Sequence, residues 1–131
     1  MCLIDTHILI WTLANPERLS TKTRMILEDQ SIFVSPISFF EIAIKQALGK
    51  LPEFALSPAA LSDAVQHDGF NVLNIQTKHI ECYKQIPLLP DHRDPFDRLL
   101  LATALNENMA IISADANFKF YEPQIQLISN D

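Results

Sequence analysis

The sequence predicts a three-layer α/β/α protein with a mostly parallel sheet of four or five strands. Short apolar runs alternate along the chain with longer segments of helical periodicity, as in α/β folds. Ser-Pro and Asp-Pro pairs open several of the helical segments. The only two glycines, Gly49 and Gly69, follow the ends of the two segments that Ser-Pro pairs open.

The first strand is expected at Cys2–Ile4, an apolar run at the start of the chain, and a helix is expected from about Thr6. Asp5 therefore lies at the carboxyl end of that strand. In an open α/β sheet ligands bind at this edge, because the helices that follow the strands point their N-termini at it.

The remaining elements are expected in regular alternation. Asn15-Pro16 ends the first helix, and Ser20 or Thr21 can cap a short second helix. Further strands are expected at 31–34, 70–75, 109–113 and 125–128, and further helices at 36–49, 58–69, 77–85 and from 95 through 105. We find no repeat, low-complexity tract or linker, so residues 1–131 are expected to form a single domain.

The composition limits the class of protein. With 48% hydrophobic residues the chain is expected to fold, and no segment reaches the ~18 to 20 apolar residues that a membrane span needs. The N-terminus has no signal-peptide pattern, so a cytoplasmic protein without membrane contact is expected. Cys2 and Cys82 lack the spacing of a zinc site and are expected to be buried. Both glycines fall at helix ends, which leaves none for a P-loop or a dinucleotide fingerprint.

The charge balance is acidic. Sixteen acidic residues against ten basic ones argue against binding to nucleic acid through a broad basic face. A nucleic-acid substrate would therefore require metal ions, or a partner protein, to offset the negative charge.

Four acids from four separate elements are expected to meet at one edge of the sheet. Asp5 ends the first strand, and Glu41 falls within the apolar stripe of the helix that follows the second strand. Asp97 lies at the third position of the apolar helix before the fourth strand, and a right-handed crossover starts this helix at the same edge. Asp115 follows the fourth strand. The stripe around Glu41 is expected to consist of Ile37, Phe40, Ile44 and Leu48.

Each acid also has a local explanation. Glu41 can reach water or pair with Lys45 one turn further on, and Asp97 favours the helix dipole. Asp115 can cap a turn, and the neighbouring Asp94 is well explained as an N-cap. The convergence of four acids from different elements favours a site over four separate local roles.

Such a site requires compensating charge. Four carboxylates within a few Å cannot all remain ionised unless cations offset them. Mg²⁺ or Mn²⁺ prefers oxygen ligands and activates water for attack on a phosphodiester. Two other α/β classes with acidic pockets fit less well: a haloacid-dehalogenase-like phosphatase needs an acid where His7 stands, and a receiver domain needs paired early acids and a late lysine.

Four segments carry these acids and span nearly the whole chain. In this order and over this length, they resemble the PIN domain, and specifically the VapC-type ribonuclease toxins of bacterial toxin–antitoxin pairs. The segments are Leu3-Ile4-Asp5-Thr6-His7, Ser35 to Leu51 with Glu41-Ile42-Ala43-Ile44-Lys45, His92-Arg93-Asp94-Pro95-Phe96-Asp97-Arg98-Leu99, and Ser113-Ala114-Asp115.

The resemblance implies a function for the acids and for the chain. Asp5, Glu41, Asp97 and Asp115 would be the catalytic, metal-binding residues, with Asp94 as a supporting or capping acid. The family further implies Mg²⁺- or Mn²⁺-dependent endoribonuclease activity and homodimerisation. It also implies inhibition by a small DNA-binding antitoxin whose tail enters the acidic groove.

Further residues are candidates for substrate contacts. His7 either orients Asp5, lines the groove or packs as a hydrogen-bonded histidine. Arg93 and Arg98 either meet phosphates or pair with nearby aspartates. Packing is favoured over base stacking or a dimer face for the aromatic residues Trp11, Phe39 and Phe40. The full set of candidate substrate contacts is Thr6, His7, Lys45, Arg93, Asp94, Arg98 and Ser113.

The sequence thus predicts a metal-dependent endoribonuclease that hydrolyses RNA through a metal-activated water. One alternative is a PIN fold that serves as a protein-binding module with negligible catalysis. The other is a nuclease for structured DNA, although the short chain offers no arch or extra domain for threading such a substrate.

Overall fold

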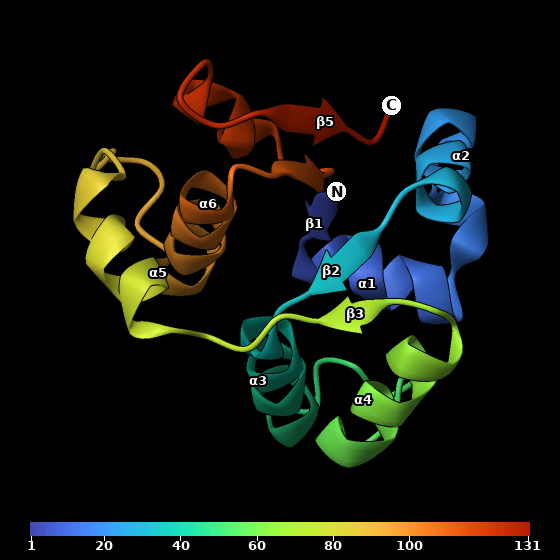
Figure 1. Cartoon of the computed structure of the whole chain (residues 1–131). Coiled ribbons are helices and arrows are strands. Elements are labelled where there is room, and N and C mark those ends of the chain that lie inside the picture. Colours follow the sequence, from blue (N-terminus) through green and yellow to red (C-terminus); the bar gives the residue numbers. More distant parts are fainter.

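A five-stranded parallel sheet forms the centre of the molecule (Figure 1). The computed structural model describes all 131 residues. The strands lie in the order β3-β2-β1-β4-β5, and every neighbouring pair is parallel, so all carboxyl ends meet at one edge. They are β1 (Cys2–Ile4), β2 (Ile32–Val34), β3 (Asn71–Val72), β4 (Ala110–Ser113) and β5 (Leu127–Ser129).

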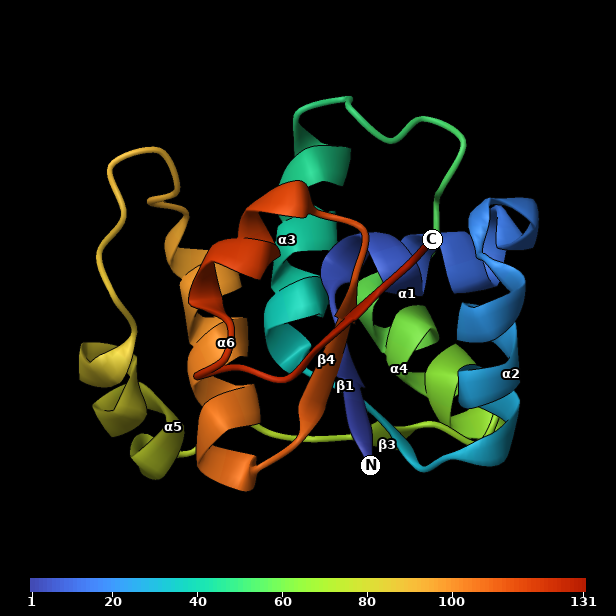
Figure 2. The ribbon, with the colours of Figure 1, turned by 90° about the horizontal axis from the view of Figure 1, so that it is seen from above.

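Helices cover both faces of this sheet. In Figure 2, α5 and α6 lie on one side of β1 and β4, with α1, α2 and α4 on the other, which confirms the expected three-layer α/β/α architecture. None of the helices is long and apolar enough to cross a membrane. The helices are α1 (Thr6–Ala14), α2 (Thr21–Asp29), α3 (Pro36–Ala47), α4 (Pro58–His67), α5 (Thr77–Cys82) and α6 (Pro95–Glu107), with 3-10 segments η1 (Pro16–Arg18), η2 (Tyr83–Gln85) and η3 (Ala116–Tyr121).

Two hydrophobic clusters hold the layers together. Successive side chains of a strand point to opposite faces, so Cys2 and Ile4 enter the cluster shared with α1 and α4, whereas Leu3 enters the cluster shared with α6. Cys2 and Cys82 are buried and free, as expected. The sheet is therefore buried on both faces, as in parallel α/β folds generally.

Local capping chemistry fixes where the helices begin and end. Gly49 and Gly69 follow α3 and α4 with φ of +71° and +87°, a conformation that glycine adopts without strain. The side chains that accept a hydrogen bond from a first-turn amide of an α-helix are those of Asp5 at α1, Ser20 at α2, Ser35 at α3, Ser57 at α4 and Asp94 at α6.

Two strands differ from the sequence expectation. The strand expected at 70–75 is regular only at Asn71–Val72. It lies at the sheet edge and pairs with β2 alone, so nothing holds residues 74 and 75 in the ladder, and both are exposed. The last strand begins at Leu127 instead of Ile125, because the Ile125 amide donates to the Tyr121 carbonyl at the end of η3.

The apolar stripe expected on α3 is wrong at two of its four positions, since Ile37 is buried and Ile44 is half-buried but Phe40 and Leu48 are exposed. Phe40 and Leu48 are 57% and 63% exposed, whereas Phe39 and Ile42 are buried in the cluster shared with α1 and α4. The helix is rotated relative to the expectation because it packs against α1 and α4 as well as against α6. Glu41 still lies on the buried side of α3.

Candidate active site

The four predicted acids arise from elements that end or begin at the carboxyl edge of the sheet. Asp5 directly follows β1 and caps α1, and Glu41 lies in the second turn of α3. Asp97 lies in the first turn of α6, and Asp115 follows β4 and caps η3. The parallel sheet therefore brings to one edge residues that are up to 110 positions apart in sequence.

Asp97 lies at the centre of the group. One carboxylate oxygen from each of Glu41, Asp94 and Asp97 lies within 4.8 Å of the others. Asp97 also shares such a cluster with Asp115 and with a ring nitrogen of His92. Asp5 lies deeper, and the charges of Asp97 and Asp115 both act to raise its pKa.

Neutral hydrogen-bond donors hold the acids in place. The Asp5 carboxylate accepts from the Ile8 amide at 2.9 Å and from the Ser113 hydroxyl. Glu41 accepts from the Thr6 hydroxyl at 2.7 Å. Since a hydroxyl has a single proton, Thr6 in turn accepts from Ser38, whose oxygen lies 3.0 Å away. These donors orient the carboxylates without neutralising them.

Burial perturbs the pKa values of three of the acids. Loss of hydration raises the pKa of Asp5 to about 7, although the hydrogen bonds from Ser113 and Ile8 oppose that rise. Burial likewise raises the pKa of Glu41 and of Asp97, and the charge of Asp97 adds to the effect on Glu41. Perturbed carboxylates grouped in this way are typical of functional sites.

The residues present fit a hard divalent cation. No lysine or arginine forms an ion pair with any of the four acids, and the pair expected between Glu41 and Lys45 is absent. Oxygens of Glu41, Asp94 and Asp97 lie within 4.8 Å of one another, and a second group of this size joins Asp97 and Asp115 to a nitrogen of His92. Carboxylate oxygens are the ligands that Mg²⁺ and Mn²⁺ prefer. Of the four predicted acids, Glu41, Asp97 and Asp115 each belong to one of these groups or to both, whereas Asp5 lies outside them.

Two of the predicted substrate contacts face the acids instead of solvent. Thr6 and Ser113 are buried and bond to Glu41 and Asp5. Asp94 accepts from the amides of Phe96 and Asp97, which agrees with the N-cap explanation. Thr6 and Ser113 therefore orient two of the acids, and Asp94 fixes the start of the helix that carries Asp97.

Two other predicted contacts border the acids and are accessible. The His7 ring is exposed and makes no hydrogen bond within the chain, so of the three alternatives the packed, hydrogen-bonded histidine is the one that the structure contradicts. With Trp11 and Asp115 it lines a cavity of about 220 Å³. Lys45 lines a second cavity of about 220 Å³ beside Glu41 and Asp94, together with Ile44, Leu48, Lys50 and Phe96.

The two arginines have opposite environments. Arg93 is exposed and unpaired, whereas Arg98 is 3% exposed, so a phosphate cannot reach it and its expected pairing with an aspartate is wrong. Its guanidinium donates to the carbonyls of Ile86 and Pro87 and to the hydroxyl of Tyr83. Arg98 therefore anchors the loop before α6.

Packing explains the aromatic residues only in part. Phe39 is buried, and Trp11 is half-buried with the guanidinium of Arg18 4.6 Å from its ring centroid. Phe40, which was expected to pack, is mostly exposed and contacts the edge of Phe96 at 5.6 Å between centroids. Exposed aromatic surface therefore lies next to the acids.

Sequence reasoning did not assign His92 or Tyr121 to the site. His92 is buried and its Nε2 lies 3.0 Å from Asp97 Oδ2, while its Nδ1 lies 2.7 Å from Tyr121 Oη. The position of His92 five residues before Asp97 was visible in the sequence, but the contact with Tyr121 was not.

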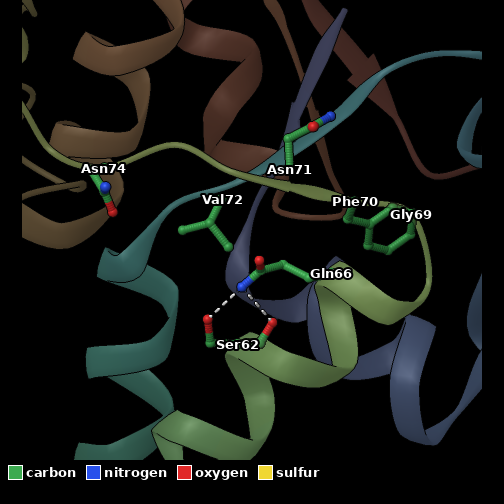
Figure 3. Close-up of a pocket in the computed structure, with 7 residues that line it drawn as sticks. All are labelled: Ser62, Gln66, Gly69, Phe70, Asn71, Val72 and Asn74. Atoms are coloured by element: carbon green, nitrogen blue, oxygen red, sulfur yellow. Dashed lines mark hydrogen bonds between the residues drawn. The ribbon is translucent and has the colours of Figure 1, made fainter.

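The largest cavity of the chain lies away from the acids. It measures about 600 Å³ and lies between α4 and the edge strand β3 (Figure 3). Its lining is uncharged, and the amide of Gln66 donates to Ser62 within it. Without a titratable group this cavity offers no acid–base chemistry, so the acidic edge remains the candidate active site. The lining residues are Ser62, Gln66, Gly69, Phe70, Asn71, Val72 and Asn74.

The chain belongs to the PIN domain family. The family model matches residues 2–122, which include all four acids and every strand except β5. No individual curated protein matches the chain at the level of sequence.

Solved structures share the fold over the whole chain. VapBC2 from Rickettsia felis, bound to a DNA fragment from its promoter, superimposes with a TM-score of 0.68 at 15% identity over 99% of this chain and 98% of the other. A toxin–antitoxin complex from Klebsiella pneumoniae gives 0.65 at 17% identity over 100% and 98%. FitAcB from Neisseria gonorrhoeae gives 0.66 at 17% identity over 99% and 98%. At these identities the likeness establishes the fold.

Proposed function

We propose that this chain is a metal-dependent endoribonuclease and the toxin of a toxin–antitoxin pair. The observation that carries the proposal is that four carboxylates from four elements meet at one edge of the sheet and none of them forms an ion pair with a lysine or arginine. Membership of the PIN family and the fold shared with toxin–antitoxin complexes support the same function.

The chain's own residues prepare the site for phosphodiester hydrolysis. Asp5, Glu41, Asp97 and Asp115 would hold Mg²⁺ or Mn²⁺, which when bound supplies an activated water and stabilises charge on the phosphodiester. The Ser113 hydroxyl and the Ile8 amide donate hydrogen bonds that orient the Asp5 carboxylate. Preorganised ligands of this kind avoid the cost of reordering side chains when the substrate arrives.

Accessible cations and aromatic rings beside the acids suit a single-stranded RNA. Lys45 and Lys50 line the cavity on one side of the acids, and Arg93 is exposed on the loop before α6. Trp11 and Phe40 offer aromatic surface on which unpaired bases can stack. These residues would contact phosphates and bases, whereas the buried Arg98 would not.

We also propose a small antitoxin and a second copy of this chain as partners. The structures that share the fold include toxin–antitoxin complexes, which motivates the antitoxin. Several large apolar side chains are exposed and provide surface for protein contacts: Phe40, Leu48, Ile80, Leu88 and Phe120. Light scattering on the purified chain would measure its oligomeric state, and co-expression with a neighbouring small reading frame would test the antitoxin.

Cleavage of a labelled RNA pool tests the function directly. The purified protein is incubated with Mg²⁺ or Mn²⁺, and with EDTA, beside the variants Asp5→Asn and Asp97→Asn. Asp63→Asn, which removes an exposed acid of α4, is the matched control. We expect discrete products that disappear with EDTA and with either site variant but persist with the control.

Other outcomes would favour the alternatives. Single-stranded and branched DNA in parallel reactions would reveal a DNA nuclease if they are cleaved and RNA is not. Absence of cleavage together with tight antitoxin binding would favour a protein-binding module.

A further inference from the structure

A buried histidine links Asp97 to Tyr121, the last residue of η3. His92, in the loop before α6, is 5% exposed, and its ring lies between Tyr121 and Asp97. The Nδ1 atom is 2.7 Å from the Tyr121 hydroxyl oxygen, and the Nε2 atom is 3.0 Å from Asp97 Oδ2. Both ring nitrogens are therefore used in hydrogen bonds.

The chemistry of the two partners sets the direction of these hydrogen bonds. The Tyr121 hydroxyl carries a proton that it can donate to Nδ1. A neutral imidazole that accepts at Nδ1 carries its proton at Nε2. Its Nε2–H group then donates to the Asp97 carboxylate.

Packing fixes the ring in this position. The ring centroids of Phe118 and Tyr121, both from η3, lie 5.8 Å and 5.6 Å from that of His92. The His92 amide donates to the Leu89 carbonyl, and Arg98 anchors the preceding loop residues through their carbonyls. The imidazole thus has little freedom to turn away from Asp97.

Two other acids of the site, Glu41 and Asp5, also accept a hydrogen bond from a neutral side chain. Thr6 donates to Glu41 and Ser113 donates to Asp5, in each case from a different element of the fold. His92 plays the same part for Asp97, the carboxylate that belongs to both acid clusters. One donor to one oxygen leaves the other lone pairs of Asp97 free for a cation.

We propose that His92 is a positioning residue, which Tyr121 holds and which in turn orients Asp97 for metal binding. This inference rests on the proposed metal-dependent nuclease function. The competing role is direct metal ligation, because the Nε2 atom lies within 4.8 Å of oxygens of Asp97 and Asp115. Its use as a hydrogen-bond donor to Asp97 excludes that role while the Nε2 proton is in place.

Conservative variants separate these possibilities. The amide nitrogen of glutamine can take the place of Nε2, so His92→Gln retains a donor for Asp97. The amide of asparagine reaches only the place of Nδ1, so His92→Asn loses that donor. Tyr121→Phe removes only the hydroxyl that holds the ring, and His67→Asn, at an exposed histidine of α4, is the matched control.

The measurements are Mn²⁺ affinity by calorimetry, steady-state RNA cleavage and thermal unfolding. Loss of a group that orients a ligand typically lowers metal affinity or activity by about 10- to 100-fold. We expect a loss of that size in His92→Asn and a smaller loss in Tyr121→Phe, in kcat and in Mn²⁺ affinity, with KM for RNA unchanged. His92→Gln and the control should remain close to the wild type.

Each other outcome contradicts the inference in a distinct way. Equal losses in His92→Gln and His92→Asn would mean that the imidazole itself is needed, as in direct ligation. Wild-type behaviour of His92→Asn and Tyr121→Phe would remove the positioning role and leave the nuclease function intact. A wild type that neither binds Mn²⁺ nor cleaves RNA would overturn the proposed function, and the positioning role with it.

Discussion

Asp5 links the stability of the chain to its chemistry. This carboxyl is 4% exposed, and burial raises its pKa from 3.8 to about 7. The folded chain therefore retains a proton on Asp5 between about pH 4 and pH 7 that the unfolded chain has lost. The contribution of this group to stability is fully present below pH 4 and is lost as the pH rises through 7.

Replacing Asp5 by asparagine should reveal this loss. The amide keeps the shape of the side chain and its acceptor oxygen but cannot ionise, so Asp5→Asn should match the metal-free wild type near pH 4. By pH 8 it should be more stable, by on the order of 4 kcal/mol for a shift of this size. Urea unfolding of both proteins in EDTA across this range measures the difference. A constant difference between the two proteins would contradict the raised pKa.

At the scale of elements, the start of α6 depends on Asp94. Its carboxylate accepts from the amides of Phe96 and Asp97, and loss of an N-cap typically costs about 1 kcal/mol. We expect Asp94→Ala to lower the free energy of unfolding by about that amount, while Asp94→Asn, which can still cap, loses about 0.5 kcal/mol or less. Equal losses in the two variants, measured by urea unfolding, would show that the charge matters more than the cap.

The loop before α6 depends on Arg98 in the same way. Truncation to alanine leaves the carbonyls of Ile86 and Pro87 without their charged donor, so we expect a loss on the order of 3 kcal/mol in the free energy of unfolding. Arg93 is exposed and unpaired, so Arg93→Ala should change stability by about 0.5 kcal/mol or less.

The exposed Arg93, unlike the buried Arg98, should also contribute to RNA binding. Arg93→Ala should weaken the binding of RNA to the Asp97→Asn protein, because a side chain able to meet phosphates is lost. Fluorescence anisotropy with a labelled RNA measures this effect. Unchanged affinity in Arg93→Ala would remove Arg93 from the substrate contacts.

At the scale of the whole molecule, bound cations should stabilise the fold. The chain has a net charge of −6, and the acids of the site form no ion pair with a lysine or arginine. A ligand that binds only the folded state at 100 times its Kd adds about 2.7 kcal/mol. We expect Mn²⁺ to raise the unfolding temperature of the wild type at pH 8 and to have little effect on Asp5→Asn. An equal rise in both proteins would indicate binding elsewhere.

Local sequence signals predicted the architecture and the placement of the acids along it. The local signals are the alternating apolar runs, the prolines at helix starts and the glycines after α3 and α4. They suffice to predict the order of helices and strands because the local conformational preference of each segment agrees with its place in the fold. The placement of Asp5 after β1 and of Asp115 after β4 follows from the same signals. In a parallel sheet the carboxyl ends share one edge, so the strand pattern alone places these two acids on the same side.

The contacts that hold the acids in place depend on the packing of distant elements and could not be predicted from the sequence. The hydroxyl of Ser113 bonds to Asp5 across 108 positions, and His92 meets Tyr121 across 29. The burial of Arg98 and the rotation of α3 depend in the same way on how helices pack against one another. Sequence periodicity reports which face of an element is apolar, but a contact between distant side chains depends on the packing of several elements at once.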